Sequence, residues 1–253
     1  MSWHWEDPDS FCRTAARVHA DHGRRARLDP VAAATPVFTR ADLVDLPVTG
    51  VEFGTLTTEH PTGLAADLVR LHADGVSTEP GTLYRVDDAR YFTALDVTAP
   101  LPFETGCVDW VYAEHLIEHV QPTAAIAWLG EVRRILSPGG LLRLSTPDLR
   151  RYAECYLRGG GFFAEHRRRM DSVIDAEAPM PARPAYMVNQ IFYLYGHRWI
   201  YDADELRHAL RAGGFGDGTI TLRAYREGAS PQVARLDRPL RNDESVYVEA
   251  INQ

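Results

Sequence analysis

The chain has 253 residues, with 35 acidic and 27 basic side chains, a net charge of −8 and an apolar fraction of 45%. This balance is ordinary for a soluble globular protein and argues against a nucleic-acid partner, because no basic patch dominates. Every basic side chain is arginine, which excludes Schiff-base chemistry on a lysine. Three scattered cysteines, no apolar run of about 18 residues and no export-type N-terminus predict a cytoplasmic protein without disulfides or membrane contact.

The N-terminal third combines an extension with the first strands. We expect residues 1–45 to form a helical extension, with a helix at Asp9–Ala20 that begins at an Asp or Ser cap. Strand and helix signals alternate after it, which predicts the start of an α/β sheet. The expected elements are a strand at Thr49–Gly54, a helix at Leu64–Ala73, and strands at Leu83–Val86 and Tyr91–Leu95.

The central stretch predicts a strand–helix–strand unit. An apolar strand at Val108–Ala113 is followed by a helix whose apolar positions include Ile126, Leu129 and Val132. A Pro-Gly-Gly sequence ends that helix, and a second apolar strand covers Leu141–Ser145. A crossover connection of this kind joins parallel strands.

The C-terminal part predicts two more helices, an insertion and two closing strands. Glycines at 159–161 and a proline-rich patch mark residues 159–201 as an insertion with a flexible loop, suited to be a lid. The elements, strands alternating with helices, fit a doubly wound open sheet that binds ligands at the carboxyl ends of its strands. The expected elements are helices at Pro147–Leu157 and Asp202–Ala212, and strands at Thr219–Tyr225 and Ser245–Ile251.

Several motifs of the central region occur in one succession. They are Leu101-Pro102-Phe103, D-W-V-Y-A-E-H-L-I-E-H from Asp109, L-G-E-V-R-R-I-L-S-P-G-G from Leu129, and R-L-S-T-P-D-L from Arg143. With this succession, residues 46–253 resemble a class I S-adenosylmethionine-dependent methyltransferase domain. The resemblance implies a Rossmann-like, seven-stranded, mostly parallel sheet with helices on both faces and an antiparallel last strand. It also implies S-adenosylmethionine as the cofactor.

The cofactor loop departs from the family pattern. Such proteins carry Gly-x-Gly after the first strand, because glycines let the backbone approach the cofactor closely. Here Gly54 is followed by Thr55 and Leu56, so the second glycine is absent. The resemblance implies that Glu52, Gly54, Asp87, Asp96 and Glu114 contact the cofactor, with Asp87 on the ribose hydroxyls and Asp96 beside the adenine. Asp88 and Asp67 are competitors for the ribose position.

The acceptor side has weaker candidates. His115 directly follows a strand, where ligands of α/β sheets bind, and a packing role is about equally well supported. His197 is either a general base or a hydrogen-bonded core histidine, and Arg198 either holds an acidic substrate or lies on the surface. The substrate-binding candidates are Tyr195, Arg198 and Tyr201.

The sequence His115-Leu116-Ile117-Glu118-His119 also matches H-x-x-E-H, an inverted zinc-peptidase signature. That signature requires a long helix, whereas Pro122 interrupts this segment directly after a strand. We therefore expect no metal, and a capping or packing role for Glu118 and His119.

Three functions fit these motifs. The first is methyl transfer from S-adenosylmethionine to a small-molecule acceptor, in bacterial secondary metabolism. The second keeps the fold, loses the cofactor and catalyses another displacement, such as an intramolecular ring closure, which gains from the same orientation effect. The third is a non-catalytic partner of a biosynthetic complex. Homo- or hetero-oligomers are compatible with each.

Overall fold

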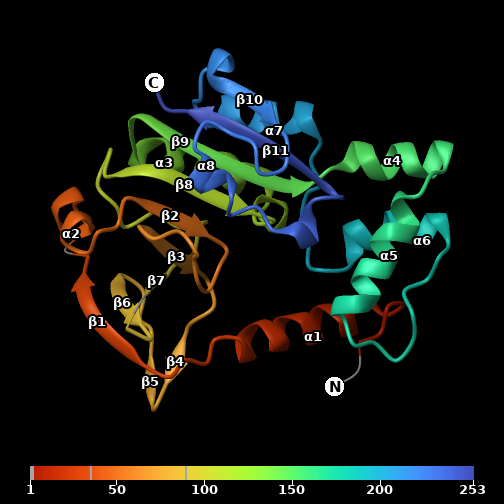
Figure 1. Cartoon of the computed structure of the whole chain (residues 1–253), viewed down its shortest axis with the longest axis horizontal. Coiled ribbons are helices and arrows are strands. Elements are labelled where there is room, and N and C mark those ends of the chain that lie inside the picture. The colour runs from red at the N-terminus through yellow and green to blue at the C-terminus, as the bar shows by residue number, and fades with distance from the viewer. Residues whose placement is uncertain (1–2, 35, 89) are drawn as a thin grey trace.

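The computed structural model describes residues 3–34, 36–88 and 90–253. Its centre is a mixed sheet that, within these residues, contains nine strands (Figure 1). The strands are β1 (Leu28–Ala33), β2 (Gly50–Phe53), β3 (Gly63–Asp67), β6 (Thr82–Val86), β7 (Arg90–Ala94), β8 (Val108–Glu114), β9 (Leu136–Pro147), β10 (Ile220–Arg223) and β11 (Ser245–Ile251). Their order is β1-β6-β7-β3-β2-β8-β9-β11-β10.

The five central strands, β7, β3, β2, β8 and β9, are parallel, and antiparallel strands extend the sheet on both sides. β11 runs antiparallel to β9, which confirms the expected antiparallel last strand. The Rossmann-like α/β class is confirmed as well. The strand count is larger than the expected seven, because β6 and β1 add to the β7 edge.

Helices flank the sheet mainly on the side of β8, β9 and β11. α3 places Trp128, Leu129 and Val132 in the main core, at the spacing that puts apolar side chains on one helix face. α7 packs beside α3, and the Asp202 carboxylate caps its first turn. The helices are α1 (Pro8–Asp21), α2 (Arg40–Asp45), α3 (Pro122–Ile135), α4 (Leu149–Arg158), α5 (Phe162–Val173), α6 (Pro184–Tyr193), α7 (Ala203–Ala212) and α8 (Pro231–Ala234).

The two faces of the sheet differ in chemistry. One face presents apolar side chains such as Val51, Phe53 and Val111 to the main core. On the other face, strand register aligns Glu52 with Tyr112, Tyr112 with Arg143, and Arg143 with Glu249. These four side chains are buried. We call residues 224–239 the cover segment, because this stretch supplies Asp237 to the buried Arg143.

No described helix connects β2 to β3 or β3 to β7. The helix expected at Leu64–Ala73 is therefore wrong: its first half is β3, and its last residues belong to the short hairpin of β4 (His72–Ala73) and β5 (Val76–Ser77). All five residues of β3 are buried, and a short apolar run that is buried on both faces has no periodicity to separate strand from helix.

The N-terminal helix and the insertion pack together. Phe11 of α1, Met170 of α5 and Met187 of α6 share a small apolar cluster with Trp5 and Leu194. Residues 174–183 between α5 and α6 form a non-helical stretch that contains Pro179 and Pro181. The flexibility of this loop and the assignment of 159–201 as a lid stay predictions. The division at residue 45 also stays a prediction, but β1 lies inside 1–45 and pairs with β6. Among the described residues, no helix is long and apolar enough to cross a membrane.

Candidate functional site

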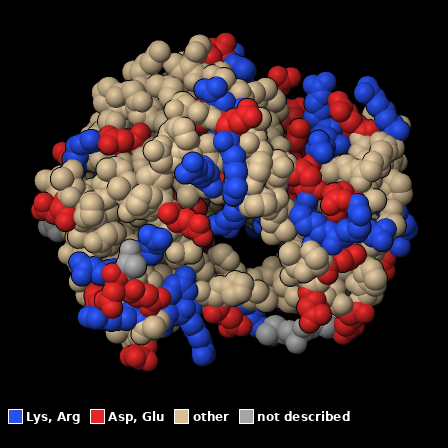
Figure 2. All heavy atoms as spheres, in the orientation of Figure 1, with Lys and Arg blue, Asp and Glu red and all other residues tan. Residues whose placement is uncertain are grey.

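A cavity of about 590 Å³ opens beyond the carboxyl end of β2. Three parts of the chain line it: the end of α1 with His19, the loop that follows β2 with Gly54, and the cover segment with Arg235 and Arg238. In the space-filling view the molecule is hollowed near its centre, with acidic and arginine side chains around the hollow (Figure 2). This volume lies within the range of small-molecule and cofactor pockets.

The loop after β2 has one glycine that the backbone needs. Gly54 has a φ of +76°, and a Cβ added there would lie 3.3 Å from Cβ of Leu116. A side chain at this position would therefore meet both an unfavourable backbone conformation and a close neighbour. Leu56, in place of the second glycine, is 9% exposed and packs with Ala65 and Phe92. The Leu56 side chain thus contributes to the apolar core, while Gly54 leaves space in which a ligand can approach the backbone.

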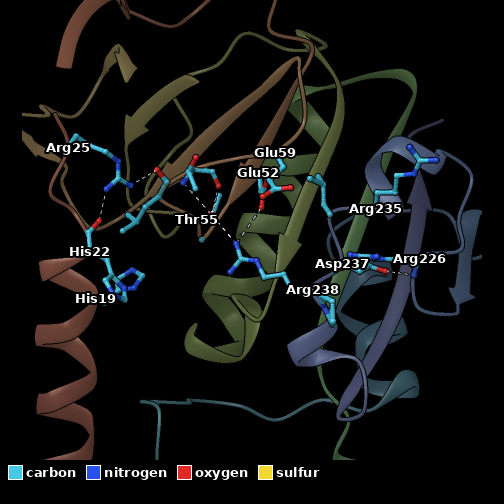
Figure 3. Close-up of a pocket in the computed structure, with 15 residues that line it drawn as sticks. His19, His22, Arg25, Glu52, Thr55, Glu59, Arg226, Arg235, Asp237 and Arg238 are labelled. Atoms are coloured by element: carbon cyan, nitrogen blue, oxygen red, sulfur yellow. Dashed lines mark hydrogen bonds and ion pairs between the residues drawn. The ribbon is translucent and has the colours of Figure 1, made fainter. Parts of the chain in front are cut away.

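Arg238 reaches toward Glu52 at the cavity (Figure 3), and it also contacts the buried carboxylate of Glu114. Its Nη2 lies 3.8 Å from Oε1 of Glu52, and its Nε lies 3.4 Å from Oε2 of Glu114. The Arg238 side chain also donates a hydrogen bond to Oγ1 of Thr55 at 3.1 Å. Burial raises the pKa of Glu52 to about 7 and raises the pKa of Glu114 above its usual range. Oε2 of each carboxylate accepts no hydrogen bond from the described residues, so both retain capacity for a ligand.

The acidic residue at the end of the strand beside β2 is Asp67. Its carboxylate is 8% exposed, accepts a hydrogen bond from the Val69 N–H at 2.8 Å and lies 3.5 Å from Nε2 of His19. The hydrogen bond that His19 donates to the Asp67 carboxylate raises the pKa of His19. Asp67 therefore occupies the edge at which the parallel strands end, and it holds the last part of α1 there.

The expected position of Asp87 is wrong. β6 runs antiparallel to β7, so Asp87 lies at the opposite edge of the sheet from the end of β3. Asp87 and Asp88 have φ values of +48° and +61°, as in the turn of a β-hairpin, and Asp87 accepts hydrogen bonds from the Ala26 and Arg27 N–H groups. Two aspartates after a strand are compatible with either a hairpin turn or a ribose-binding site. In this structure they form a turn.

Asp96 follows β7 at the carboxyl edge, where the sequence placed it. It is exposed, and its Oδ1 accepts hydrogen bonds from the backbone N–H and the hydroxyl of Thr98. Its contact with adenine stays a prediction.

A second polar group lies past the end of β8. Nδ1 of His115 is 3.4 Å from Oε1 of Glu118, and Nε2 is 2.7 Å from Oγ of Ser245. Glu118 is fully buried, and its Oε2 accepts a hydrogen bond from Thr146 at 3.0 Å. Burial raises the pKa of Glu118 to about 8. His115 has a φ of +52°, a conformation that non-glycine residues adopt mainly where the surroundings hold them.

His197 lies beside His119, with ring centroids 4.8 Å apart. Nδ1 of His197 lies 2.6 Å from the Ile191 carbonyl oxygen and must carry the proton, so Nε2 is the free acceptor. Burial lowers the pKa of His197 to about 4. The structure thus brings the two histidine candidates, His115 and His197, to either side of the Glu118-His119 pair.

The other acceptor candidates are less well placed. Tyr195 is half-buried and contacts the rings of Phe11 and His197. Arg198 is exposed, and its backbone N–H donates to the Glu118 carbonyl. Tyr201 is 1% exposed within the main core, which contradicts its expected place at a substrate surface.

Sequence reasoning missed the residues that reach the cavity from far along the chain. His19 and Arg25 come from the end of α1 and just after it, and Arg238 comes from the cover segment. Nothing local in the sequence marks them, because their function depends on how distant segments meet. Arg143 is paired with the buried carboxylates of Asp237 and Glu249. These pairs could not be predicted without knowing how the strands and the cover segment are aligned.

A family model described as a methyltransferase domain matches residues 37–217, which include the Gly54 loop, β3 and Glu52, Glu114, His115 and Glu118, but not Arg238 or Ser245. The chain belongs to this methyltransferase-domain family. The matched region is more than half of this chain, and it begins at residue 37, before β2. No curated protein matches the chain significantly.

Solved structures with similar folds accompany the family match. An S-adenosylmethionine-dependent methyltransferase from Mesorhizobium loti is 17% identical, with 83% of this chain and 96% of that chain covered and a TM-score of 0.41. A methyltransferase from Haloferax volcanii, in complex with the Trm112 methyltransferase activator, is also 17% identical, with 81% and 82% covered and a TM-score of 0.41. Geranyl diphosphate methyltransferase with sinefungin is 14% identical, with 85% and 76% covered and a TM-score of 0.43. Likeness at this level says nothing about the substrate or partner of the methyltransferase-domain protein.

The residues at the cavity suit the cofactor that the family implies. S-adenosylmethionine carries an ammonium, a sulfonium and ribose hydroxyls. Glu52 lines the cavity, and its Oε2 accepts no hydrogen bond from the described residues. Glu114 lies on the other side of Arg238 from Glu52, and Asp67 ends the strand that pairs with β2. Cations favour such carboxylates, and hydroxyls donate to them.

Proposed function

We propose that this protein transfers a methyl group from S-adenosylmethionine to a small-molecule acceptor. One observation carries the proposal: a cavity opens at the carboxyl ends of the parallel strands, beside Gly54 and Glu52, in a methyltransferase-domain chain. Ligands of open α/β sheets bind at this edge. The bound cofactor would supply the electrophilic methyl group.

Each cofactor contact follows from the position of a side chain. Gly54 keeps Cβ atoms away from the methionine part. Glu52 and Glu114 attract the ammonium and the sulfonium, and Asp67 accepts hydrogen bonds from the ribose hydroxyls once His19 moves aside. Asp96 lies beyond the next strand, on the side where the adenine would extend.

His115 and His197 are the candidate bases on the acceptor side. The pKa of each imidazole is lowered by burial, so both rings are neutral near pH 7 and each keeps one unprotonated nitrogen, although the lowered pKa makes each a weak base. Nε2 of His197 is unprotonated by virtue of the hydrogen bond at Nδ1. We place this chemistry in bacterial secondary metabolism, where small acceptors are common.

The test compares two aspartates at opposite edges of the sheet. Isothermal titration with S-adenosylmethionine and with its demethylated product is expected to show binding to the wild-type chain. Asp67→Asn should weaken binding by about 10- to 100-fold, because a charge-assisted hydrogen bond is lost. Asp87→Asn, the matched control at the other edge, should change it by less than about twofold. Equal effects of the two variants would reject the proposed cofactor position.

A second function is favoured by one specific contact. Arg238 already neutralises Glu52 and Glu114, as a guanidinium would if it had replaced a cationic cofactor. The fold would then orient a substrate for a displacement without S-adenosylmethionine, such as a ring closure. Absence of any cofactor binding, together with turnover of a substrate by the purified chain, would support this function. Absence of both binding and turnover would leave a partner role.

A further inference from the structure

We propose that Glu118, His119 and His197 bind a divalent transition-metal ion of the zinc type. Among the described residues, one Glu118 oxygen and one ring nitrogen from each histidine all lie within 4.8 Å of one another. None of the three residues lines the cavity beside Gly54. A bound ion would occupy Nε2 of His197, so metal binding and the general-base role proposed for His197 are alternatives, whereas cofactor binding at the cavity is a separate question.

The donor set selects the class of metal. Two imidazoles and a carboxylate suit zinc, iron and their neighbours, whereas calcium and magnesium prefer oxygen ligands alone. Ligand atoms about 2.0–2.1 Å from a tetrahedral ion lie about 3.4 Å apart. Binding therefore needs the most separated of the three atoms to approach by about 1.4 Å, a movement that the exposed His119 side chain would have to make, because Glu118 is fully buried.

The ring of His197 is already oriented as a ligand. Its Nδ1–H is fixed on the Ile191 carbonyl oxygen at 2.6 Å, so the Nε2 lone pair is available. A second hydrogen bond of this kind is the usual way in which proteins fix the tautomer of a ligating histidine. A buried histidine makes the same hydrogen bond when it only packs, so this contact alone does not indicate a metal.

Glu118 has a buried oxygen, Oε1, that accepts no hydrogen bond from the described residues. The Ser245 hydroxyl donates its single hydrogen to the Arg241 carbonyl at 2.6 Å, so it must accept from Nε2–H of His115. Neutral His115 then turns a bare Nδ1 toward Oε1 of Glu118, 3.4 Å away. Oε1 accepts no hydrogen bond from the described residues and is fully buried. Two facing acceptors in a buried site require a proton or a cation between or beside them.

The charges around the cluster permit a cation. Arg241 lies near enough to lower the pKa of His119 and Glu118, but its guanidinium is 3.6 Å from a Glu244 carboxylate oxygen. Arg169 pairs with Asp243. Glu118 has no arginine partner among the described residues, and a bound cation would displace the proton that its raised pKa favours. His119 is exposed, so the ion would have an open side for water or an oxygen ligand of the substrate, as catalytic zinc sites do.

Metal binding to the full chain tests the proposal without any cofactor. The chain is stripped with a chelator, and Zn²⁺ and Co²⁺ are titrated, with Co²⁺ followed by its visible d–d absorption. We expect one ion per chain, and a loss of affinity of at least about 100-fold in His119→Ala and His197→Ala, since even outer-shell changes cost about 10- to 100-fold. His208→Ala on the exposed face of α7 is the matched control and should bind as the wild type does.

Glu118→Gln keeps the shape of the side chain and removes a buried charge, so it tests the site if an alanine variant fails to fold. It should also lose the Co²⁺ spectrum while its circular dichroism stays that of the wild type. Weak binding that is equal in the wild type and all three variants would overturn the proposal. Failure of S-adenosylmethionine binding would not affect it, because the two titrations are independent.

Discussion

The two halves of the sheet are covered in different ways. Over β8, β9 and β11, helices α3 and α7 place Trp128, Leu129 and Leu206 in the main core. Over β2, β3 and β7, the connections contain no described helix, and Leu56 from the loop after β2 supplies part of the apolar cover. The cavity opens in this loop-covered half.

This difference shows why the cavity carries so many charges. A helix that packs on a sheet presents an apolar stripe to it, whereas a loop can present polar side chains and backbone groups to the same place. Glu52 thus remains uncovered by a helix, and Arg238 reaches it from the cover segment. Substitutions in the two halves should therefore have different effects.

Arg143→Leu should have the largest effect, because this side chain anchors the cover segment on the helix-covered half. Arg143 is fully buried and donates to Asp237 at 2.8 and 2.5 Å and to Glu249 at 3.0 Å. Its removal leaves buried Asp237 without its counter-ion, while Glu249 keeps Arg223 at 2.7 Å, so we expect the free energy of unfolding to fall by about 3–5 kcal/mol. Urea unfolding measures it.

The exposed pair Arg207–Asp217 gives the control for Arg143. Arg207→Leu should cost less than about 1 kcal/mol. If both variants lost the same small amount, the cover segment would not depend on the buried ion pairs, and the contrast between the halves would be less sharp than the contacts suggest.

Glu52→Gln tests the charge that the loop-covered half leaves at the cavity. Burial raises the Glu52 pKa from 4.5 to about 7, so the folded state binds a proton more tightly than the unfolded state does. The wild type should therefore lose stability as the pH rises from about 4.5 to 7, by up to about 3 kcal/mol. The variant lacks this loss.

The measurement is the difference in unfolding free energy between wild type and Glu52→Gln at pH 5 and at pH 8. The difference should shift in favour of the variant by up to about 3 kcal/mol at the higher pH. A constant difference would mean that Glu52 titrates normally and is better hydrated than its 4% exposure indicates.

Much of the helix-covered half could be predicted from the sequence. The apolar positions of α3 and the flanking strands follow local rules, and β8 lies where expected. β9 contains the expected strand Leu141–Ser145 but begins at Leu136, so the Pro-Gly-Gly sequence lies inside it. The loop-covered half could not be predicted as well. The buried strand β3 carries no alternation, and the role of Asp67 depends on which strand pairs with β2. Glu52 and Gly54 line the cavity, and their contact with the cofactor, like that of Glu114, stays a prediction. Arg238 could not be predicted, because it comes 124 residues after Glu114.

Leu56→Ala tests whether the loop after β2 replaces helical cover. Leu56 is 9% exposed and packs with Ala65, Tyr84 and Phe92. Truncation should lower the free energy of unfolding by about 2–3 kcal/mol, through lost apolar burial and the remaining void. Leu68→Ala, at a side chain that is 70% exposed, is the control and should be within about 0.5 kcal/mol of the wild type. Equal small effects would show that the loop is not part of the core.

Arg238→Ala has the smallest expected effect, and this effect is on ligand affinity. The variant leaves Glu52 and Glu114 without their guanidinium, so a cationic ligand should be favoured over a neutral one. S-adenosylmethionine differs from its demethylated product by the sulfonium charge. We expect the variant to shift the ratio of the two dissociation constants toward S-adenosylmethionine by about fivefold, or about 1 kcal/mol, since the arginine is half-exposed and its charge is screened. Arg235→Ala lines the same cavity without a described carboxylate partner and should leave the ratio unchanged. A shift toward the demethylated product would mean that Arg238 faces the sulfonium from elsewhere, and that the two carboxylates do not hold the cationic part of the cofactor.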